Sequence, residues 1–336
     1  MVAKYAMDQP EGFVNRIQRV AIVGAGGQLG RHITEELLKT GQHTITAVTR
    51  AGGNSTFPDG VIPAAVDYTD ESALVSALKG QQFLIITLPH DAAPETHANI
   101  VEAAGKAGVP YVMPNIYTCD IVISNKSLGD EVILGQKLRP IVEHIEQVGK
   151  SSWTVLVTSL WYEFSLACPP DWFGFDVAKR EVTFFDDGER KINTSSWPFI
   201  GKTVAAFLSL KELPENENDN SLTVSSFRNK PLYTSSFFIS QRDMLDSIHR
   251  VSGTSDKDWT IKKEATSKRV TDGQALLATG DLRGLARMYY SRMFFPGTEG
   301  TYQDKLHNKA LGLPEDDLDQ ATKRALAMIE SNWRPM

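Results

Sequence analysis

The sequence predicts an α/β fold in which a doubly wound parallel sheet is followed by a smaller C-terminal α+β lobe. Short apolar runs alternate with segments of helical periodicity up to about residue 160. Such alternation is typical of parallel sheets with helices on both faces. The alternation then stops and the rhythm becomes irregular. The chain has 336 residues, which is long enough for two parts because single cores stop growing near about 250–300 residues.

Each strand expected in the first part is an apolar or β-branched run. In chain order these runs are residues 20–23, 44–49, 61–66, 83–88, 111–113 and 153–158. The expected helices carry apolar residues at helical spacing and cover residues 28–40, 70–78, 96–107 and 128–148. Asp70 is the expected N-cap of the second helix. Pro140 should kink or break the fourth.

The second part has a different pattern. Residues 182–185 and 191–194 flank the turn Asp187-Gly188, which predicts a β-hairpin. Further helices are expected at residues 200–210, 240–251, 281–293 and 315–330, with a polar connector at 215–220. We therefore expect residues 1–160 to form the sheet domain, with a polar leader at 1–17. Residues 161–336 should form mainly the smaller lobe, and some of its segments can return to the sheet domain.

Composition excludes several classes of protein. Lys and Arg number 35 against 41 Asp and Glu, a formal net charge of −6, whereas a general nucleic-acid binder needs a basic surface. Two distant cysteines, Cys119 and Cys168, exclude a disulfide scaffold and fit a reducing compartment. The start has no apolar signal region, and no stretch nears the roughly 20 apolar residues of a membrane span. We expect a cytoplasmic protein with no membrane or nucleic-acid partner.

A glycine-rich turn joins the first strand to the first helix. It reads Gly24-Ala25-Gly26-Gly27-Gln28-Leu29-Gly30, with glycines at G-x-x-G-x-x-G spacing. Glycine lets the backbone turn sharply and approach a pyrophosphate, whose charge is met by N–H groups at the helix N-terminus. In this strand–turn–helix context the motif predicts nucleotide binding. The residues expected at the cofactor are Gly24, Gly26, Gly27, Gln28, Leu29 and Gly30.

The ends of the next strands indicate which dinucleotide is bound. An NAD site carries an acid after the second strand, but this chain has Thr49-Arg50. A guanidinium there can pair with a 2′-phosphate, so Arg50 favours NADP(H). Asp67, after the third strand, could meet the adenine edge or equally cap the following turn. Leu88-Pro89-His90 ends the fourth strand on the cofactor side.

Lys137 is the candidate for proton transfer. The Tyr-x-x-x-Lys pair of short-chain dehydrogenases is absent, because Ile133 stands four residues before this lysine. Near a nicotinamide and in a dry pocket, the pKa of the ammonium would fall, which makes it usable as an acid or base. Spacing alone favours an ordinary exposed helix lysine. No histidine or cysteine spacing predicts a metal site.

Aromatic residues are dense just after the sixth strand. This density is compatible with a core, but its position suggests walls for an aromatic or apolar substrate. The residues concerned are Trp161, Tyr162, Phe164, Trp172 and Phe173.

With these motifs the chain resembles the NmrA-like atypical short-chain dehydrogenases, and more closely their fungal isoflavone-reductase-like members. The resemblance covers most of residues 18–250. It rests on residues 24–30, 48–50, 113–115, 159–166, 182–188 and 191–194.

The resemblance implies a Rossmann-type domain that binds NADPH, with a small substrate lobe. Relatives of the isoflavone-reductase kind reduce activated double bonds or open benzylic ethers of aromatic natural products. Their helix lysine stands where Lys137 stands here. By the same resemblance Pro114 and Asn115 are expected at the cofactor and Tyr117 at the substrate. Ile116 departs from the family pattern, which has a glutamate at this place.

The function expected is an NADPH-dependent reductase of a small aromatic or heteroaromatic metabolite. A hydride would pass from the nicotinamide to an electrophilic carbon, with Lys137 assisting proton transfer. Two alternatives remain open. One is an NADP(H)-sensing regulator without turnover, and the other is a non-redox cyclase or isomerase on the same fold. Either a monomer or a homodimer is compatible with the sequence.

Overall fold

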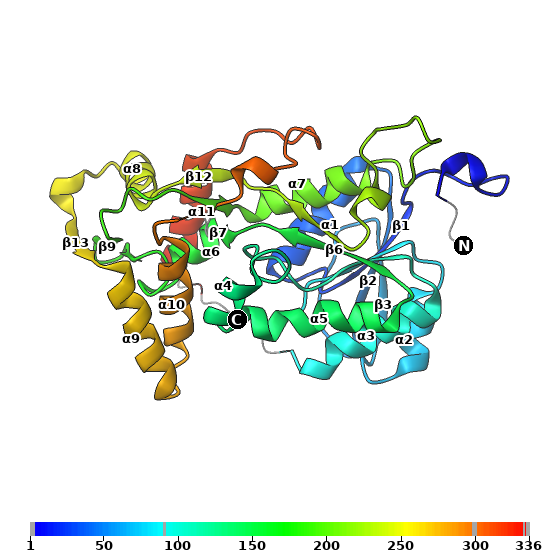
Figure 1. Ribbon diagram of the computed structural model, residues 1–336, viewed down its shortest axis with the longest axis horizontal. Coiled ribbons are helices and arrows are strands. Elements are labelled where there is room, and N and C mark those ends of the chain that lie inside the picture. The colour runs from blue at the N-terminus through cyan, green and yellow to red at the C-terminus, as the bar shows by residue number, and fades with distance from the viewer. Residues whose placement is uncertain (1–3, 90–91, 298–300, 332, 334–336) are drawn as a thin grey trace.

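The computed structural model describes residues 4–89, 92–297, 301–331 and 333 (Figure 1). Its centre is a seven-stranded sheet in the order β11-β6-β5-β4-β1-β2-β3, with every neighbouring pair parallel. The order reverses between β1 and β4, as in Rossmann-type sheets, which confirms the predicted fold class. The strands are β1 (Arg19–Val23), β2 (Thr44–Arg50), β3 (Val61–Val66), β4 (Phe83–Ile86), β5 (Tyr111–Met113), β6 (Ser152–Val157) and β11 (Lys230–Tyr233).

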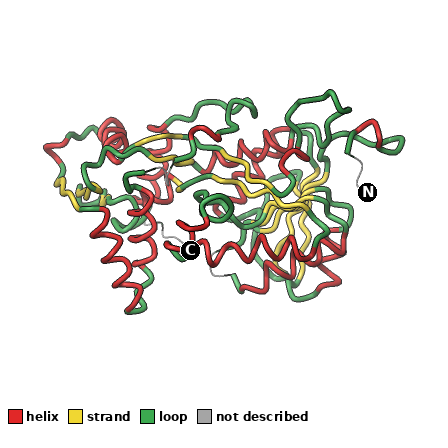
Figure 2. The backbone as a smooth tube through the Cα atoms, viewed as in Figure 1, coloured by secondary structure: helices red, strands yellow, loops and turns green. Residues whose placement is uncertain are grey.

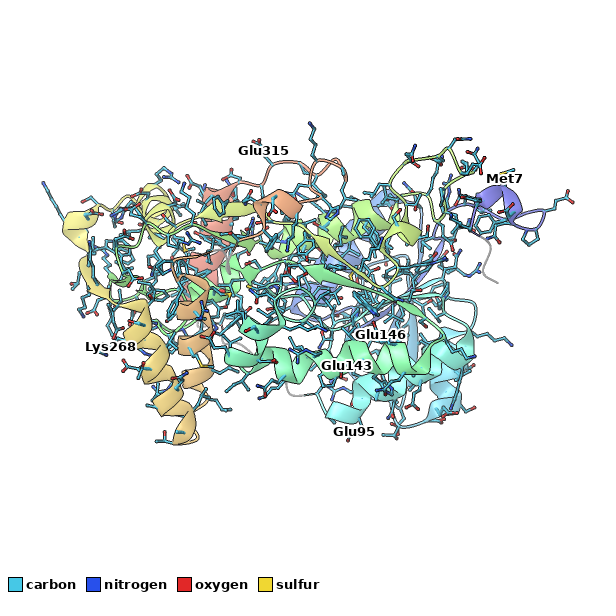
Figure 3. All side chains as sticks on the ribbon, in the orientation of Figure 1. Met7, Glu95, Glu143, Glu146, Lys268 and Glu315 are labelled. Carbon is cyan, nitrogen blue, oxygen red and sulfur yellow. The ribbon has the colours of Figure 1, made fainter. Side chains whose placement is uncertain are left out.

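Helices cover both faces of this sheet (Figure 2). One face carries α1 (Gln28–Thr40) and α7 (Trp197–Leu208), and the other carries α2 (Glu71–Leu78), α3 (Pro94–Ala107) and α5 (Leu134–Val148). Asp70 accepts a hydrogen bond from Ala73 N at 3.0 Å, which confirms it as the N-cap of α2. Charged side chains such as Glu95 and Glu143 lie on the outer helix surfaces (Figure 3).

The apolar runs of the strands follow from burial on two faces. In β4 every residue is fully buried. Phe83 and Ile85 pack with α1 and α7, whereas Leu84 and Ile86 pack with α2, α3 and α5. A strand buried in this way needs apolar residues at consecutive positions rather than alternate ones.

The smaller lobe contains two three-stranded sheets and most of the remaining helices. One sheet has the order β12-β10-β7 and the other β13-β9-β8. The strands are β7 (Leu160–Trp161), β8 (Phe175–Asp176), β9 (Glu181–Phe185), β10 (Ile192–Ser195), β12 (Phe237–Ile239) and β13 (Thr260–Glu264). The helices are α6 (Tyr162–Ala167), α8 (Gln241–Ser252), α9 (Thr266–Ala278), α10 (Arg283–Met293) and α11 (Leu318–Glu330). Although they follow residue 160 in the chain, β11 and α7 pack in the sheet domain.

The predicted hairpin is wrong. Strand β9 pairs with β8 and β13, and β10 pairs with β7 and β12, so the two strands lie in different sheets. The chain leaves β9 at Asp186, where φ is +56°. The Asp186 carboxylate accepts hydrogen bonds from Thr266 N and Oγ1 at 3.0 and 2.7 Å. It therefore binds the start of α9, and the turn directs the chain into the second sheet.

The helix predicted over residues 128–148 is also divided differently. Helix α4 (Lys126–Glu131) ends before α5 begins, and the break lies at Val132-Ile133 rather than at Pro140. Gly129 and Gly135 touch at this crossing, because a Cβ on Gly135 would collide with the backbone of Gly129. Pro140 lies inside α5, which continues past it.

In the part of the chain that the structure describes, no helix combines the length and the apolar character needed to cross a bilayer.

Candidate functional site

The glycine-rich turn lies where the strand order reverses, at the carboxyl end of β1. Gly24 has φ of +80°, and a Cβ there would collide with the Thr87 carbonyl oxygen beyond β4. A Cβ on Gly30 would collide with the Gly24 carbonyl. Thr87 Oγ1 donates a hydrogen bond shared between the carbonyls of Val23 and Gly24, at 2.9 and 3.1 Å. Only glycine fits at positions 24 and 30, so the motif serves a close packing of α1 against β1 and β4.

The N-terminus of α1 fits an anion. Its N-cap, Gly27, offers no side-chain acceptor. Gly27 N donates to Gly24 O at 2.9 Å, and Arg31 N donates to Gly27 O at 3.0 Å. Within the described residues, the intervening N–H groups of Gln28, Leu29 and Gly30 have no acceptor outside the helix. Free N–H groups at the positive end of a helix suit a phosphate group, so the cradle fits the pyrophosphate of a dinucleotide.

Arg50 stands at the end of β2, beside this cradle. Its side chain is exposed, and no carboxylate among the described residues pairs with it. Ser55 and Phe57, in the loop after β2, lie 3.5 Å from the position that a Cβ on Gly26 would take. The strand end, the following loop and the glycine turn therefore border one another.

Asp67 has the capping role in this structure. Its Oδ1 accepts hydrogen bonds from Thr69 N and Thr69 Oγ1, both at 2.8 Å. These bonds hold the pKa of the carboxyl below its usual value. The sequence left two roles open for Asp67, an adenine contact and a cap of the following turn. In the structure its side chain caps the turn.

The ends of β4 and β5 are tied together by side chains. Asn115 Nδ2 donates to Leu88 O at 3.0 Å, and Tyr117 OH donates to Ile86 O at 3.1 Å. Pro89 is exposed and Pro114 buried, while His90 lies outside the described residues. Tyr117 is 8% exposed, and burial raises the pKa of its phenol. Ile116, which replaces the acid of the family pattern, is packed in the core.

Lys137 lies in the first turn of α5. This helix leads from β5 to β6 in a parallel sheet, so it begins at the carboxyl edge. The side chain is exposed, and no carboxylate among the described residues pairs with it. Ile133 lies one helical turn earlier, and its carbonyl accepts Lys137 N at 3.3 Å. The structure thus brings the lysine to the expected edge, but it does not enclose it.

The aromatic residues after β6 separate into two groups. Trp161 and Phe164 are half-buried and touch each other and Trp197, with ring centroids 6.0 to 6.4 Å apart. Trp172 is half-buried beside Tyr290. By contrast, Tyr162 and Phe173 are at most 1% exposed and belong to the core. Trp161, Phe164 and Trp172 therefore keep surface for a ligand, whereas Tyr162 and Phe173 have almost none.

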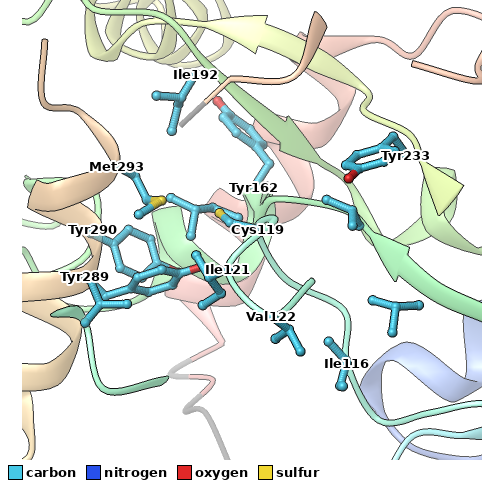
Figure 4. Close-up of a cluster of buried hydrophobic side chains, with 14 of the residues drawn as sticks. Ile116, Cys119, Ile121, Val122, Tyr162, Ile192, Tyr233, Tyr289, Tyr290 and Met293 are labelled. Atoms are coloured by element: carbon cyan, nitrogen blue, oxygen red, sulfur yellow. The ribbon is translucent and has the colours of Figure 1, made fainter. Parts of the chain in front are cut away.

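A tyrosine-rich contact between lobe and sheet was missed from sequence (Figure 4). Tyr289 and Tyr290 of α10 lie close to Cys119, which follows β5. Tyr289 OH and Thr118 Oγ1 are 2.8 Å apart. Burial raises the pKa of the Cys119 thiol to about 11, so it stays protonated at neutral pH. No local pattern marks this contact, because its partners are about 170 residues apart in sequence.

Comparison with known proteins agrees with the resemblance drawn from sequence. Residues 16–168 match the model of the NmrA-like family. The chain is 26% identical over 307 residues to Oxidoreductase aprR of Aspergillus flavus, an alignment that covers 90% of this chain and 96% of that protein.

Two solved structures share the fold. The complex of AtPrR2 with NADP⁺ and (+)pinoresinol has a TM-score of 0.69 at 18% identity, covering 93% of this chain and 99% of that one. The NADPH complex of the quinone oxidoreductase QOR2 from Escherichia coli has a TM-score of 0.64 at 19% identity, covering 91% and 99%. At these identities the two likenesses establish the fold.

Proposed function

We propose that this NmrA-like chain is an NADPH-dependent reductase of a small aromatic or heteroaromatic metabolite. The observation that carries the proposal is the cradle at the N-terminus of α1, with the unpaired Arg50 beside it. Support comes from a fungal relative described as an oxidoreductase and from two proteins of the same fold that bind NADP⁺ or NADPH. The first of these two structures also holds (+)pinoresinol, and the second is that of a quinone oxidoreductase.

The residues divide the work as follows. Bound NADPH would supply the hydride. The N–H groups of Gln28, Leu29 and Gly30 would hold the pyrophosphate, and Arg50 the 2′-phosphate. Trp161 and Phe164 would provide an apolar surface for the substrate ring. Lys137 Nζ would donate the proton that completes the reduction.

The cofactor assignment is tested at Arg50. A charge-assisted hydrogen bond is worth about 1.5–3 kcal/mol, so Arg50→Ala should weaken NADPH binding about 10- to 100-fold. NADH affinity should change less than about twofold, because that ligand lacks the phosphate. Isothermal titration calorimetry with both dinucleotides measures this, and Lys79→Ala, which removes an exposed charge after α2, serves as the control. Equal weakening of both dinucleotides would refute the 2′-phosphate contact.

The reductase assignment is tested with substrates. Purified protein is supplied with NADPH and, in turn, pinoresinol, an isoflavone and 1,4-naphthoquinone, and loss of nicotinamide absorbance is followed. Turnover is expected with at least one of them. Lys137→Ala should lower kcat by roughly 10²–10⁴ while NADPH affinity is kept. Lys126→Ala, an exposed lysine of α4, should retain activity. Full activity in Lys137→Ala would remove this lysine from the mechanism.

A dinucleotide sensor without turnover is the second candidate. Two observations favour it. Lys137 is exposed, so it does not stand in an enclosed reaction site. Tyr289 and Tyr290 of α10 are packed against the segment after β5, so they leave no space for a substrate there. A sensor should bind NADP⁺ and NADPH and consume neither with any compound of the panel. Turnover with one compound would reject it.

A further inference from the structure

A cavity of about 320 Å³ opens between the sheet domain and the lobe. Helix α1 contributes Arg31 and His32, α7 contributes Trp197, and α6 and α11 contribute Glu163 and Arg324. The volume lies at the lower end of the range for ligand pockets, which is enough for a molecule of one or two rings. Because the walls come from both parts of the fold, a ligand here would contact both.

The charged residues of the cavity leave one positive charge in excess. Glu163 is 1% exposed, and its Oε1 accepts hydrogen bonds from Arg324 Nε and Nη2 at 2.9 and 2.7 Å. Its Oε2 accepts from Trp197 N at 3.3 Å. This carboxylate is therefore fully engaged. Arg31 is exposed, and no carboxylate in the described part of the chain pairs with it.

The pKa of His32 also indicates a positive electrostatic potential in the cavity. Burial, followed by the charges of Arg31, Arg324 and Lys39, lowers the pKa of His32 to about 4. The imidazole is therefore neutral near pH 7, and it adds no charge of its own. An anion entering the cavity would meet an attractive potential.

Apart from Ser331, the remaining walls are apolar and partly flat. Trp197 is 4% exposed and stacks on His32, with ring centroids 6.2 Å apart and planes 25° apart. Pro198, Ala327 and Met328 complete this side. Such a surface favours a ring over a flexible polar chain, because a ring buries apolar area at little entropic cost.

We propose that this cavity binds a small aromatic carboxylate, with its ring among Trp197, Pro198 and Met328 and its carboxylate paired with Arg31. The site is distinct from the glycine turn. Arg31 lies four residues after Gly27 on the same helix, beyond the N–H groups that face the pyrophosphate. The carboxylate and NADPH should therefore bind together.

The test is calorimetric titration of the full chain with 1-naphthoate and with its neutral analogue 1-naphthamide. Wild-type protein should bind naphthoate at least about tenfold more tightly than naphthamide. Arg31→Ala should remove that preference. Lys79→Ala is the control, since it deletes an exposed positive charge after α2 that does not line the cavity. Naphthoate affinity in this control should stay within about threefold of wild type.

A second variant tests the location independently of charge. Met328→Trp fills the cavity from α11 and should abolish binding of both compounds, while circular dichroism and the melting temperature report folding. Saturating NADPH should leave naphthoate affinity within about threefold, as expected for separate sites.

Three outcomes would overturn the proposal. One is unchanged naphthoate affinity in Arg31→Ala, and another is displacement of naphthoate by NADPH. The third is wild-type protein that binds no naphthoate at millimolar concentration.

Discussion

Ile133 adopts a backbone conformation that β-branched residues rarely take. Its φ and ψ are +66° and −32°, and Leu134 N donates to Val132 O at 2.7 Å around it. This hydrogen bond closes a γ-turn of the rare, strained kind, and a backbone outlier of this sort costs about 1–3 kcal/mol. The neighbouring helices enforce it, through the ion pair of Arg139 with Asp130 at 2.7 Å and the close crossing of two glycines. Strain of this kind persists where the surrounding structure over-determines the backbone.

Replacing Ile133 with glycine should therefore not lower the free energy of unfolding, as the same change does at an unstrained position. Ile133→Gly removes the strain of the γ-turn but increases the entropy of the unfolded chain, so the free energy of unfolding should rise by up to about 1 kcal/mol. Urea unfolding measures it. The matched control is Ile62→Gly, because Ile62 is also exposed but lies in the extended strand β3, where the change should cost about 1 kcal/mol. A loss of stability in Ile133→Gly as large as in the control would show that the turn is unstrained.

Among elements, those formed by local patterns were predicted, and those set by distant contacts were not. Helix α1 was placed from its first to its last residue, since its apolar spacing and the terminal Gly41 are local signals. The hairpin prediction was wrong because β9 and β10 pair with strands far along the chain, β9 with β13 and β10 with β12. The break between α4 and α5 was not predicted, because it is caused by tertiary contacts. Gly129 lies against Gly135 and against the carbonyl of Ile121.

The same distinction holds for the candidate sites. The glycine turn and Arg50 were recognised because a strand, a turn and a helix follow one another directly. The cavity beside Trp197 was invisible to sequence reasoning, because Arg31 and Arg324 meet there from opposite ends of the chain. Glu163 was not predicted as a site residue either. Its neighbours in sequence are aromatic, and its partner Arg324 lies 161 residues away, so no local pattern indicates the ion pair.

For the molecule as a whole, buried histidines link folding to pH. His97 is 7% exposed, and no partner of its Nε2 lies among the described residues. Burial, and then the nearby His144, lowers the pKa of His97 to about 4, against about 6.5 in an unfolded chain. The unfolded chain therefore takes up a proton at higher pH than the folded one. Stability is complete above about pH 6.5 and falls as the pH drops towards about 4, with no further loss from this group below that.

From His97 alone, the free energy of unfolding should be about 2 kcal/mol lower at pH 5 than at pH 7. His97→Phe keeps the ring but cannot take up the proton, so its loss between the two pH values should be smaller by that amount. Urea unfolding at each pH measures the difference, and Lys106→Gln, on the same helix, should match wild type. Burial raises the pKa of Glu163 and Glu212, which acts in the opposite direction, so the comparison between variants rather than the total slope isolates His97. If His97→Phe and wild type lose equal stability, the imidazole is already charged in the folded protein near pH 5.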